Sequence, residues 1–429
     1  MAADIHRAID AVWRMESPRL IAGLTRMVRD VSLAEDFAQD ALVAALERWP
    51  ESGIPENPGA WLMTAAKHRA IDTFRRNKLL ERKHEELGRE YDARQEAAVA
   101  DLENAIDDSV GDDLLGLMFI SCHPVLPPEA RVALTLRLLG GLTTDEIARA
   151  FLLPEATIAQ RIVRAKRTLA EKRVPFEVPR AADLPARLSS VLEVIYLVFN
   201  EGYSATAGDD LLRPALCDDA VRLGRILAEL TPNEPEVHGV VALMEIQASR
   251  AAARVGPTCE PILLLDQDRS RWDRLLISRG LAALQRAKGL GGLRGPYALQ
   301  AAIAACHATA ATPADTDWAG IATLYASLLE QVPSPVVELN RAVAVGMAFG
   351  PAAGLEIVDR LAAEPSLKSY HLLPSVRGDL LAKLGRHEEG CAEFERAASM
   401  TRNSRERDLL LNRARTCAEA VASANHEPS

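Results

Sequence analysis

The stretch TTDEIARAFLLPEATIAQRIVRAKRTL, residues 143–169, predicts two helices joined by a tight turn. Thr143 and Glu146 have the spacing of a capping box, in which the two side chains satisfy backbone N–H groups at a helix start. Pro154 suits the first position of the second helix, where a missing N–H costs nothing. The pattern is that of a helix-turn-helix.

The second predicted helix, residues 155–170, has two different faces. Its apolar face repeats at spacings of 4, 3 and 4, through Ile158, Ile162, Ala165 and Leu169. Its polar face carries Thr157, Gln160, Arg164 and Arg167. A helix that reads the major groove needs one face for its scaffold and another for base edges, where arginine pairs with guanine and glutamine with adenine. Arg161 and Lys166 are expected on phosphates. The alternative is an ordinary helical hairpin with a solvated basic face.

Composition favours an all-α protein of about two to four domains. The 429 residues are 48% hydrophobic but only 4% aromatic, and Ala, Leu, Arg and Glu recur throughout. The most apolar stretch, 191–199, is interrupted by Glu193, so we expect no membrane span. The first ten residues lack a signal-peptide pattern, and six scattered cysteines form no CxxC pair. These features predict a cytoplasmic protein.

Charge is distributed unevenly along the chain. The formal net charge is −10, which argues weakly against a protein that coats nucleic acid. Residues 156–173, however, hold six basic side chains and one acidic side chain. A local basic stripe in an acidic chain is typical of a DNA-reading element.

Two further helices are predicted upstream, over residues 33–49 and 60–78, separated by the Pro- and Gly-containing loop 51–59. Ser32 and Glu35 predict a capping box at the start of the first. Its apolar stripe is Phe37, Ala41, Ala45 and Trp49. Its other face is acidic and partly apolar, which suits docking on a basic protein partner.

The second upstream helix combines an aromatic residue with several cations. Trp61 is placed to stack on an unpaired base, or alternatively to pack in the core. The cations that would follow a single strand are Lys67, His68, Arg69, Arg75 and Arg76. Asp72 is expected to order these cations through salt bridges.

Here a resemblance becomes specific. Residues 34–49 resemble the segment of the sigma-70 family that grips the clamp of RNA polymerase. Residues 58–76, with W-L-x-x-A-A-x-x-R-A-I-D-x-x-R-R, resemble its −10 recognition and melting segment, and residues 112–173 resemble its region 4, which reads the −35 element. The short layout is similar to the extracytoplasmic-function (ECF) type. The resemblance implies polymerase contacts at Asp36, Phe37, Gln39, Asp40, Val43 and Glu47.

The chain then continues well beyond the usual end of that type. We predict region 2 at 1–77, an acidic linker, partly helical at best, at 78–111, region 4 at 112–178 and a helical extension at 179–429. Within the extension, GDLLAKLGRHEEGCAEFERA (378–397) resembles the tetratricopeptide pattern, with a fainter copy at 340–361. A known variety of the type carries such an extension, thought to be needed for activity, and a motif like LLDQDRSRWD, which stands here at 264–273.

That motif has several interpretations. As an internal docking motif, it would bury Trp272 as an anchor and pair Arg269 with an acid; it could instead contact the polymerase or a regulator. The other residues assigned to this docking role are Asp266, Gln267, Asp268 and Asp273. A metal site at its carboxylates lacks the Gly-bearing loop that calcium sites use, and a hydrolase built on Asp266, Asp268 and His307 lacks supporting spacing. The adjacent pair Cys122-His123 is too little for structural zinc. We expect no metal, no cofactor and no enzymatic activity.

The sequence thus predicts a sigma factor. Its expected partners are core RNA polymerase, through clamp and flap, promoter DNA, and a regulatory protein or ligand at the C-terminal domain. The alternative is a one-component regulator whose helix-turn-helix binds an operator and whose C-terminal domain senses a ligand. That alternative predicts stable DNA binding without polymerase.

Overall fold

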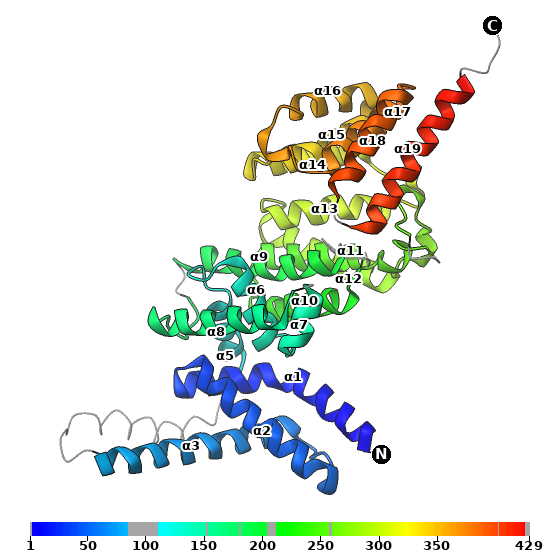
Figure 1. The fold of residues 1–429 in the computed structure, drawn as a ribbon. Coiled ribbons are helices and arrows are strands. Elements are labelled where there is room, and N and C mark those ends of the chain that lie inside the picture. Colours follow the sequence, from blue (N-terminus) through cyan, green and yellow to red (C-terminus); the bar gives the residue numbers. More distant parts are fainter. Residues whose placement is uncertain are drawn as a thin grey trace. The chain divides into compact units, whose positions relative to one another are not determined.

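The protein is helical throughout its described parts. The computed structural model describes residues 2–84, 110–151, 153–179, 182–203, 212–256, 260–401 and 403–424. Over these ranges it contains 18 α-helices, short 3-10 turns and one isolated β-bridge, between Val255 and Pro261. The predicted all-α class is therefore confirmed. The chain forms two compact units, Met1–Leu197 and Val198–Ser429 (Figure 1).

Three long helices open the first unit. They are α1 (Ala2–Val28), α2 (Val31–Ser52) and α3 (Pro58–His84), and each packs against the other two. Both upstream helices predicted from the sequence are present. The apolar stripe of α2 is buried, and Phe37 meets Phe74 of α3 edge-on, with ring centroids 6.2 Å apart.

The predicted start of α2 at Ser32 is wrong. The helix begins at Val31, because the Asp30 carboxylate accepts hydrogen bonds from the backbone N–H groups of Ser32 and Leu33, at 2.7 and 3.0 Å. Both Asp30 and Ser32 are residue types that cap helices well. The α3 helix continues to His84, into the predicted linker, and residues 85–109 of that linker lie outside the described residues.

The rest of the first unit contains the helix-turn-helix. Its helices are α5 (Val110–Ser121), α6 (Pro128–Leu138), α7 (Thr144–Ala150), α8 (Glu155–Glu171) and the first part of α9 (Leu184–Tyr203). The α8 helix packs on α6 and α7, and α5 packs on α1. Large apolar side chains, including Leu117, Phe119 and Leu134, are almost completely buried there.

The first helix of the predicted extension also belongs to this unit in part. On α9, Arg187 donates to the Phe119 carbonyl at 2.7 Å, and Ser190 donates to the Cys122 carbonyl at 2.6 Å. Arg131 of α6 donates to the Ser190 hydroxyl at 2.6 Å and to Glu193 at 2.9 Å. The two units therefore divide inside α9, after residue 197, whereas the domain limits proposed from the sequence remain predictions.

The second unit is built of helices that pack on their neighbours along the chain. Five of them begin with proline at the first position, which needs no N–H partner. After α9 they are α10 (Pro214–Leu230), α11 (Pro235–Ala248), α12 (Arg274–Gly291), α13 (Pro296–Thr309), α14 (Trp318–Gln331), α15 (Pro335–Phe349), α16 (Pro351–Leu361), α17 (Leu372–Lys383), α18 (His387–Met400) and α19 (Ser404–Ala424).

Both tetratricopeptide-like segments form helical hairpins, α15 with α16 and α17 with α18. Glycines allow close approach in each hairpin. A Cβ at Gly354 would lie 2.7 Å from the Ala342 carbonyl oxygen, and one at Gly378 would lie 3.1 Å from that of Gly390. Gly385, with φ of +77°, turns the chain between α17 and α18. The predicted helical-hairpin architecture of the extension is confirmed.

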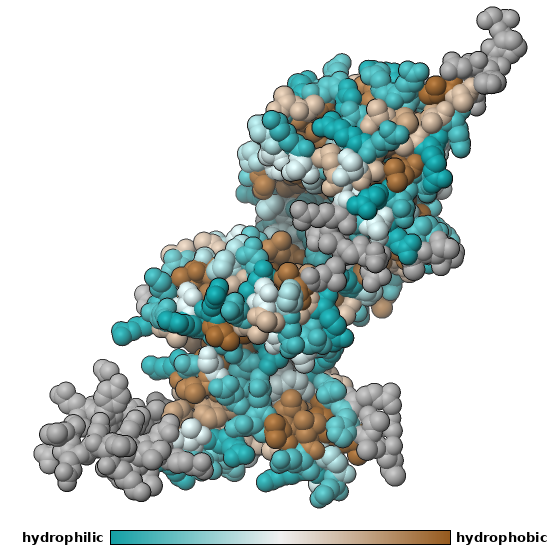
Figure 2. All heavy atoms as spheres, viewed as in Figure 1, coloured by the Kyte–Doolittle hydropathy of each residue, from teal (hydrophilic) through white to brown (hydrophobic). Residues whose placement is uncertain are grey.

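The surfaces of both units are largely hydrophilic on the face shown in Figure 2, with apolar groups interspersed. Within the described residues, no helix combines the length and apolar character that a membrane-spanning segment requires.

Candidate nucleic-acid and polymerase interfaces

The helix-turn-helix has the geometry that its sequence predicts. The Thr143 hydroxyl accepts from the Glu146 N–H at 3.1 Å, while the Glu146 carboxylate accepts from the Thr143 N–H at 2.8 Å. Pro154 precedes α8 as its N-cap. The four residues of the predicted apolar stripe of α8 are all buried. Tertiary packing thus fixes one face of α8 and leaves the other to a partner.

The outward face of α8 carries most of the predicted DNA contacts. Gln160, Arg164 and Arg167 are exposed, while Thr157 and Arg161 are half-buried. Arg167 also pairs with Glu171 one turn later, at 2.6 Å. Such an exposed pair contributes little to stability and exchanges readily for a phosphate. The side chains proposed to read bases are therefore accessible.

Lys166 is the member of the set that faces inward. It forms an ion pair with Glu35 of α2, and Arg137 of α6 donates its Nε–H to the same carboxylate at 2.6 Å. Glu35 is only 4% exposed. Burial alone raises the pKa of Glu35, but the charges of Lys166 and Arg137 outweigh it, so the pKa is lower than usual. This cluster of Glu35, Arg137 and Lys166, the α2–α8 ion cluster, ties two predicted interfaces together.

Sequence reasoning missed this cluster. Glu35 had been assigned to a local cap, and its partners lie 102 and 131 residues further along the chain. The only signal that the sequence offers is a glutamate on an otherwise apolar face of the predicted helix.

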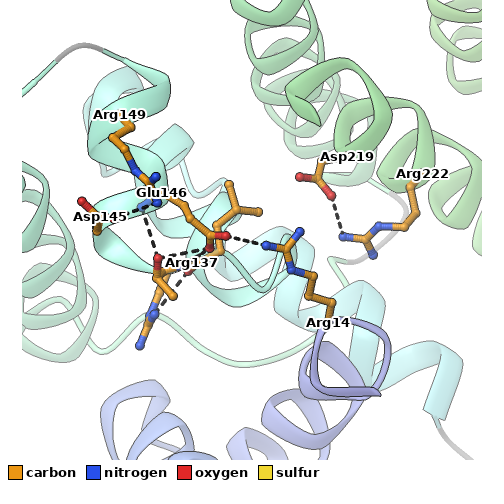
Figure 3. A network of polar contacts seen from close by, with 9 residues as sticks. Arg14, Arg137, Asp145, Glu146, Arg149, Asp219 and Arg222 are labelled. Atoms are coloured by element: carbon orange, nitrogen blue, oxygen red, sulfur yellow. Dashed lines mark hydrogen bonds and ion pairs between the residues drawn. The ribbon is translucent and has the colours of Figure 1, made fainter. Parts of the chain in front are cut away.

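A second ion pair links α1 to the helix-turn-helix. Arg14 of α1 reaches Glu146, whose carboxylate also caps α7 (Figure 3). In the same view, Arg149 pairs with Asp145 at 2.8 Å, and Arg137 donates to the Leu142 carbonyl at 3.2 Å. The start of α7 is thereby held by its own cap and by a neighbouring helix.

The acidic face of α2 is accessible over most of its length. Asp36, Asp40 and Glu47 are exposed, and Val43 is 52% exposed, which is unusual for valine. Gln39 is half-buried and donates to Glu35 at 3.0 Å. Phe37 departs from this predicted face. It is 5% exposed because it belongs to the buried stripe, so its side chain is not available to a partner in this structure.

The predicted −10 residues of α3 differ in how far they are exposed. His68, Arg69 and Arg75 are exposed and Lys67 is half-buried, whereas the side chain of Arg76 lies outside the described residues. Trp61 is half-buried and meets Trp49 edge-on, with ring centroids 5.2 Å apart. Trp61 thus packs and keeps part of its surface accessible, so the two alternatives for it do not exclude each other.

Cys122 and His123 have structural partners. Cys122 is buried, with Sγ 3.3 Å from the Thr135 hydroxyl, and burial raises the pKa of its thiol to about 11. His123 accepts from the Val125 N–H at 3.1 Å, and partial burial lowers its pKa to about 4. In the second unit, burial likewise raises the pKa of Cys217 to about 12. The described residues include no group of three or more metal-binding side chains.

Several side chains of the DQDRSRWD motif have structural roles within the second unit. Trp272 is 3% exposed, as expected for an anchor. Asp268 and Asp273 accept from backbone N–H groups at helix starts, and Asp266 is exposed. His307 is the remaining residue of the hydrolase alternative. Its ring meets that of Trp318 edge-on, with ring centroids 5.1 Å apart, and burial lowers the pKa of His307 to about 4. The geometry supplies no catalytic arrangement from these groups.

The predicted pairing of Arg269 with an acid is wrong. Its guanidinium donates to the carbonyl oxygens of His307 and Ala310, at 2.7 and 2.5 Å, at the end of α13. The last carbonyls of a helix have no partner within the helix and attract cations. Arg269 therefore closes the C-terminus of α13.

Family comparisons agree with this geometry. A model of sigma-70 region 2 matches residues 12–79, and a model of sigma-70 region 4 matches residues 117–169. A family of unknown function, DUF6596, matches residues 187–288. Fold and sequence thus define the class of protein. It is a transcription initiation factor with modules that bind RNA polymerase and the promoter. The chain belongs to the sigma-70 family as an ECF-type member with a C-terminal extension.

Two relatives are similar to this chain over different shares of its length. An uncharacterized protein of Rhizobium meliloti (strain 1021), R00370, is 42% identical over 399 residues, which is 93% of each chain. A probable ECF RNA polymerase sigma factor of Mycobacterium tuberculosis, SigI, is 27% identical over 176 residues, covering 41% of this chain and 59% of that protein. Sigma factors are non-catalytic initiation factors that bind core RNA polymerase and promoter DNA.

Proposed function

We propose that this protein directs core RNA polymerase to a specific set of stress- or signal-responsive promoters and helps open their −10 elements, under the influence of its C-terminal extension. The observation that supports this most strongly is the separation of two accessible faces on different helices of one unit. The outward face of α8 is cationic, and the outward face of α2 is acidic. An acidic face suits a basic protein surface and a cationic face suits DNA.

Region 2 would act first on the polymerase and then on one strand. The exposed acids and Val43 of α2 dock on the clamp, where Val43 supplies apolar contact. His68, Arg69 and Arg75 of α3 hold the backbone of the non-template strand, and the accessible edge of Trp61 supports an unstacked base. Unstacking a base costs only a few kcal/mol, so a modest pocket can offset it.

Region 4 would read the −35 element through α8. Arg164 and Gln160 are the exposed side chains with bidentate hydrogen-bonding capacity toward base edges. Arg161 and Lys166 contact phosphates and fix the position of the helix in the groove.

The α2–α8 ion cluster implies that the first unit opens on the promoter. Elements about 25 base pairs apart are separated by about 85 Å at about 3.4 Å per base pair. While this ion pair joins α2 to α8, region 2 cannot lie at the −10 element and region 4 at the −35 element at the same time. Glu35 must therefore release Lys166 when the factor binds the promoter. Lys166 then becomes available to a phosphate.

In vitro transcription with purified core polymerase, full-length protein and a randomised promoter library tests the proposal. We expect factor-dependent transcripts enriched in paired −35 and −10 sequences. The Arg164→Ala variant should lose selection at one or two −35 positions, whereas Arg19→Ala, an exposed arginine of α1, should not. Absence of any affinity for core polymerase, with stable binding to DNA alone, would favour the one-component regulator instead.

A further inference from the structure

A pocket of about 350 Å³ lies in the second unit, between the segment that follows α11 and helices α17 and α19. Its size falls within the range of pockets that hold small organic molecules. The side chains that decide its chemistry are Tyr203, Arg250, Arg254, Ile262, Gln267 and Leu409. Five of these lie in the segment matched by the family of unknown function.

Two arginines give this pocket a positive wall. The Arg254 guanidinium lies over the Tyr203 ring, 3.7 Å from its centroid, and donates to the Tyr203 carbonyl. Arg250 approaches the same ring at 5.9 Å. Burial, and the nearby charge of Arg250, lower the pKa of Arg254. Among the described residues no carboxylate forms an ion pair with either arginine, and Arg250 Nε is buried without a hydrogen-bond partner.

The other charges at the pocket already have partners. Arg413 pairs with Asp379. Glu406 lies 3.3 Å from His371 and accepts from the Thr401 hydroxyl at 2.9 Å. Glu406 is the one carboxylate among the residues that line the pocket, and its pKa is lowered by the hydrogen bond with His371 and, to a smaller extent, by the charge of Arg254. Arg250 and Arg254 together exceed this single negative charge, so an anion would balance the remainder.

Gln267 offers an unused acceptor to the same pocket. Like Arg269 and Trp272, it is a buried member of DQDRSRWD, with 8% of its surface exposed. Its Nε2 donates to the Ile262 carbonyl at 3.2 Å, but its Oε1 is buried and has no partner in the described part of the chain. A buried polar atom is normally hydrogen-bonded, so this oxygen points to a donor on a ligand.

We propose that this pocket binds a small organic carboxylate that also carries an N–H or O–H donor and an apolar body. The carboxylate pairs with Arg250 and Arg254, and the donor bonds Gln267 Oε1. The apolar body lies against Ile262 and Leu409, which also line the pocket. An N-acylated amino acid with an aliphatic side chain has all three features. The binding site stands independently of the sigma factor role.

Isothermal titration of the full-length protein with N-acetyl-L-leucine, and with its neutral amide N-acetyl-L-leucinamide, tests the charge requirement. The two probes differ only in the carboxylate. We expect the acid to bind about tenfold more tightly than the amide, because charge-assisted hydrogen bonds to arginine are among the strong ones. Equal affinities, or no binding of N-acetyl-L-leucine and N-acetyl-L-phenylalanine, would overturn the proposal.

Variants then place the binding in this pocket. Arg250→Gln should weaken the acid about tenfold or more and leave the amide unchanged, and Gln267→Leu should weaken both probes. Arg279→Gln makes the same charge change at an exposed position of α12 and should bind like the unaltered protein. Unchanged affinity in Arg250→Gln and Gln267→Leu refutes the site. If Arg250→Gln does not fold, as judged by thermal unfolding, Gln267→Leu and the acid–amide comparison still decide.

Discussion

Replacing Glu35 with glutamine should loosen the hold of α2 on α8 in the first unit. The change keeps the size of the side chain and one oxygen acceptor but removes the charge that Arg137 and Lys166 share. Glu35 is almost fully buried, so few other groups can replace it. The expected consequence is more frequent opening of this unit.

The size of the effect follows from burial. Removing one partner of a fully buried ion pair costs about 3–5 kcal/mol, because the other charge is left unpaired. Here the side chains of Arg137 and Lys166 are 23% and 15% exposed, so water compensates part of the loss. We expect about 2 kcal/mol, which corresponds to an opening equilibrium about 30-fold larger.

Hydrogen exchange of the full-length protein, read by mass spectrometry, measures this opening directly. Peptides from α8 and α2 should exchange about 30-fold faster in Glu35→Gln, while peptides from α14 to α18 should not change. Glu51→Gln, at an exposed position near the end of α2, is the matched control. If α8 kept its protection in Glu35→Gln, the ion cluster would not be what holds the two helices together.

The same cluster predicts a pH dependence. The pKa of Glu35 is lowered in the folded protein, so its ion pairs contribute their full stability above the unfolded value, which is near 4.5. That contribution is lost as the pH falls through the lower folded pKa. The difference in exchange between wild type and Glu35→Gln should therefore be constant from pH 7 to about pH 5 and shrink below pH 4.5. A difference that shrinks near neutral pH would contradict the lowered pKa.

Three further predictions concern other parts of the chain. Arg164→Ala should cost about 1–3 kcal/mol of discrimination at one or two −35 base pairs, measured on promoter variants, and a uniform loss across sequences would instead assign Arg164 to phosphates. Arg269→Met should destabilise the second unit by about 2–3 kcal/mol in urea unfolding, because two carbonyls of α13 lose a charged donor, and an unchanged midpoint would refute that role. A chain ending at residue 178 should melt about 5 °C below one ending at residue 203, since it lacks the α9 contacts of Arg131, and equal midpoints would show those contacts to be dispensable.

The sequence predicted the helix-turn-helix well because its determinants are local. The two residues of the capping box are three positions apart, and the apolar stripe of α8 repeats within one helix. The same local logic failed at Ser32, where another good capping residue, Asp30, stands two positions earlier. Glu35 forms ion pairs with residues of α6 and α8 and does not cap the start of its own helix.

Contacts between distant segments could not be predicted in this way. Arg269 meets carbonyls 38 and 41 residues away, and Arg131 meets a serine 59 residues away. An arginine in the sequence suggests a carboxylate partner, yet helix ends offer acceptors that no residue type reveals. The pocket around Gln267 likewise depends on α19, which the motif itself cannot indicate.

The protonation state of two buried thiols limits how an oxidative signal could act on this protein. With pKa values raised to about 11 and about 12, Cys122 and Cys217 remain protonated at neutral pH. Only about one Cys122 in ten thousand would be a thiolate, the form that peroxides and electrophiles attack. Oxidants and electrophiles should therefore react slowly with these two thiols. Reversible, noncovalent binding is the better route for a signal to act on the protein.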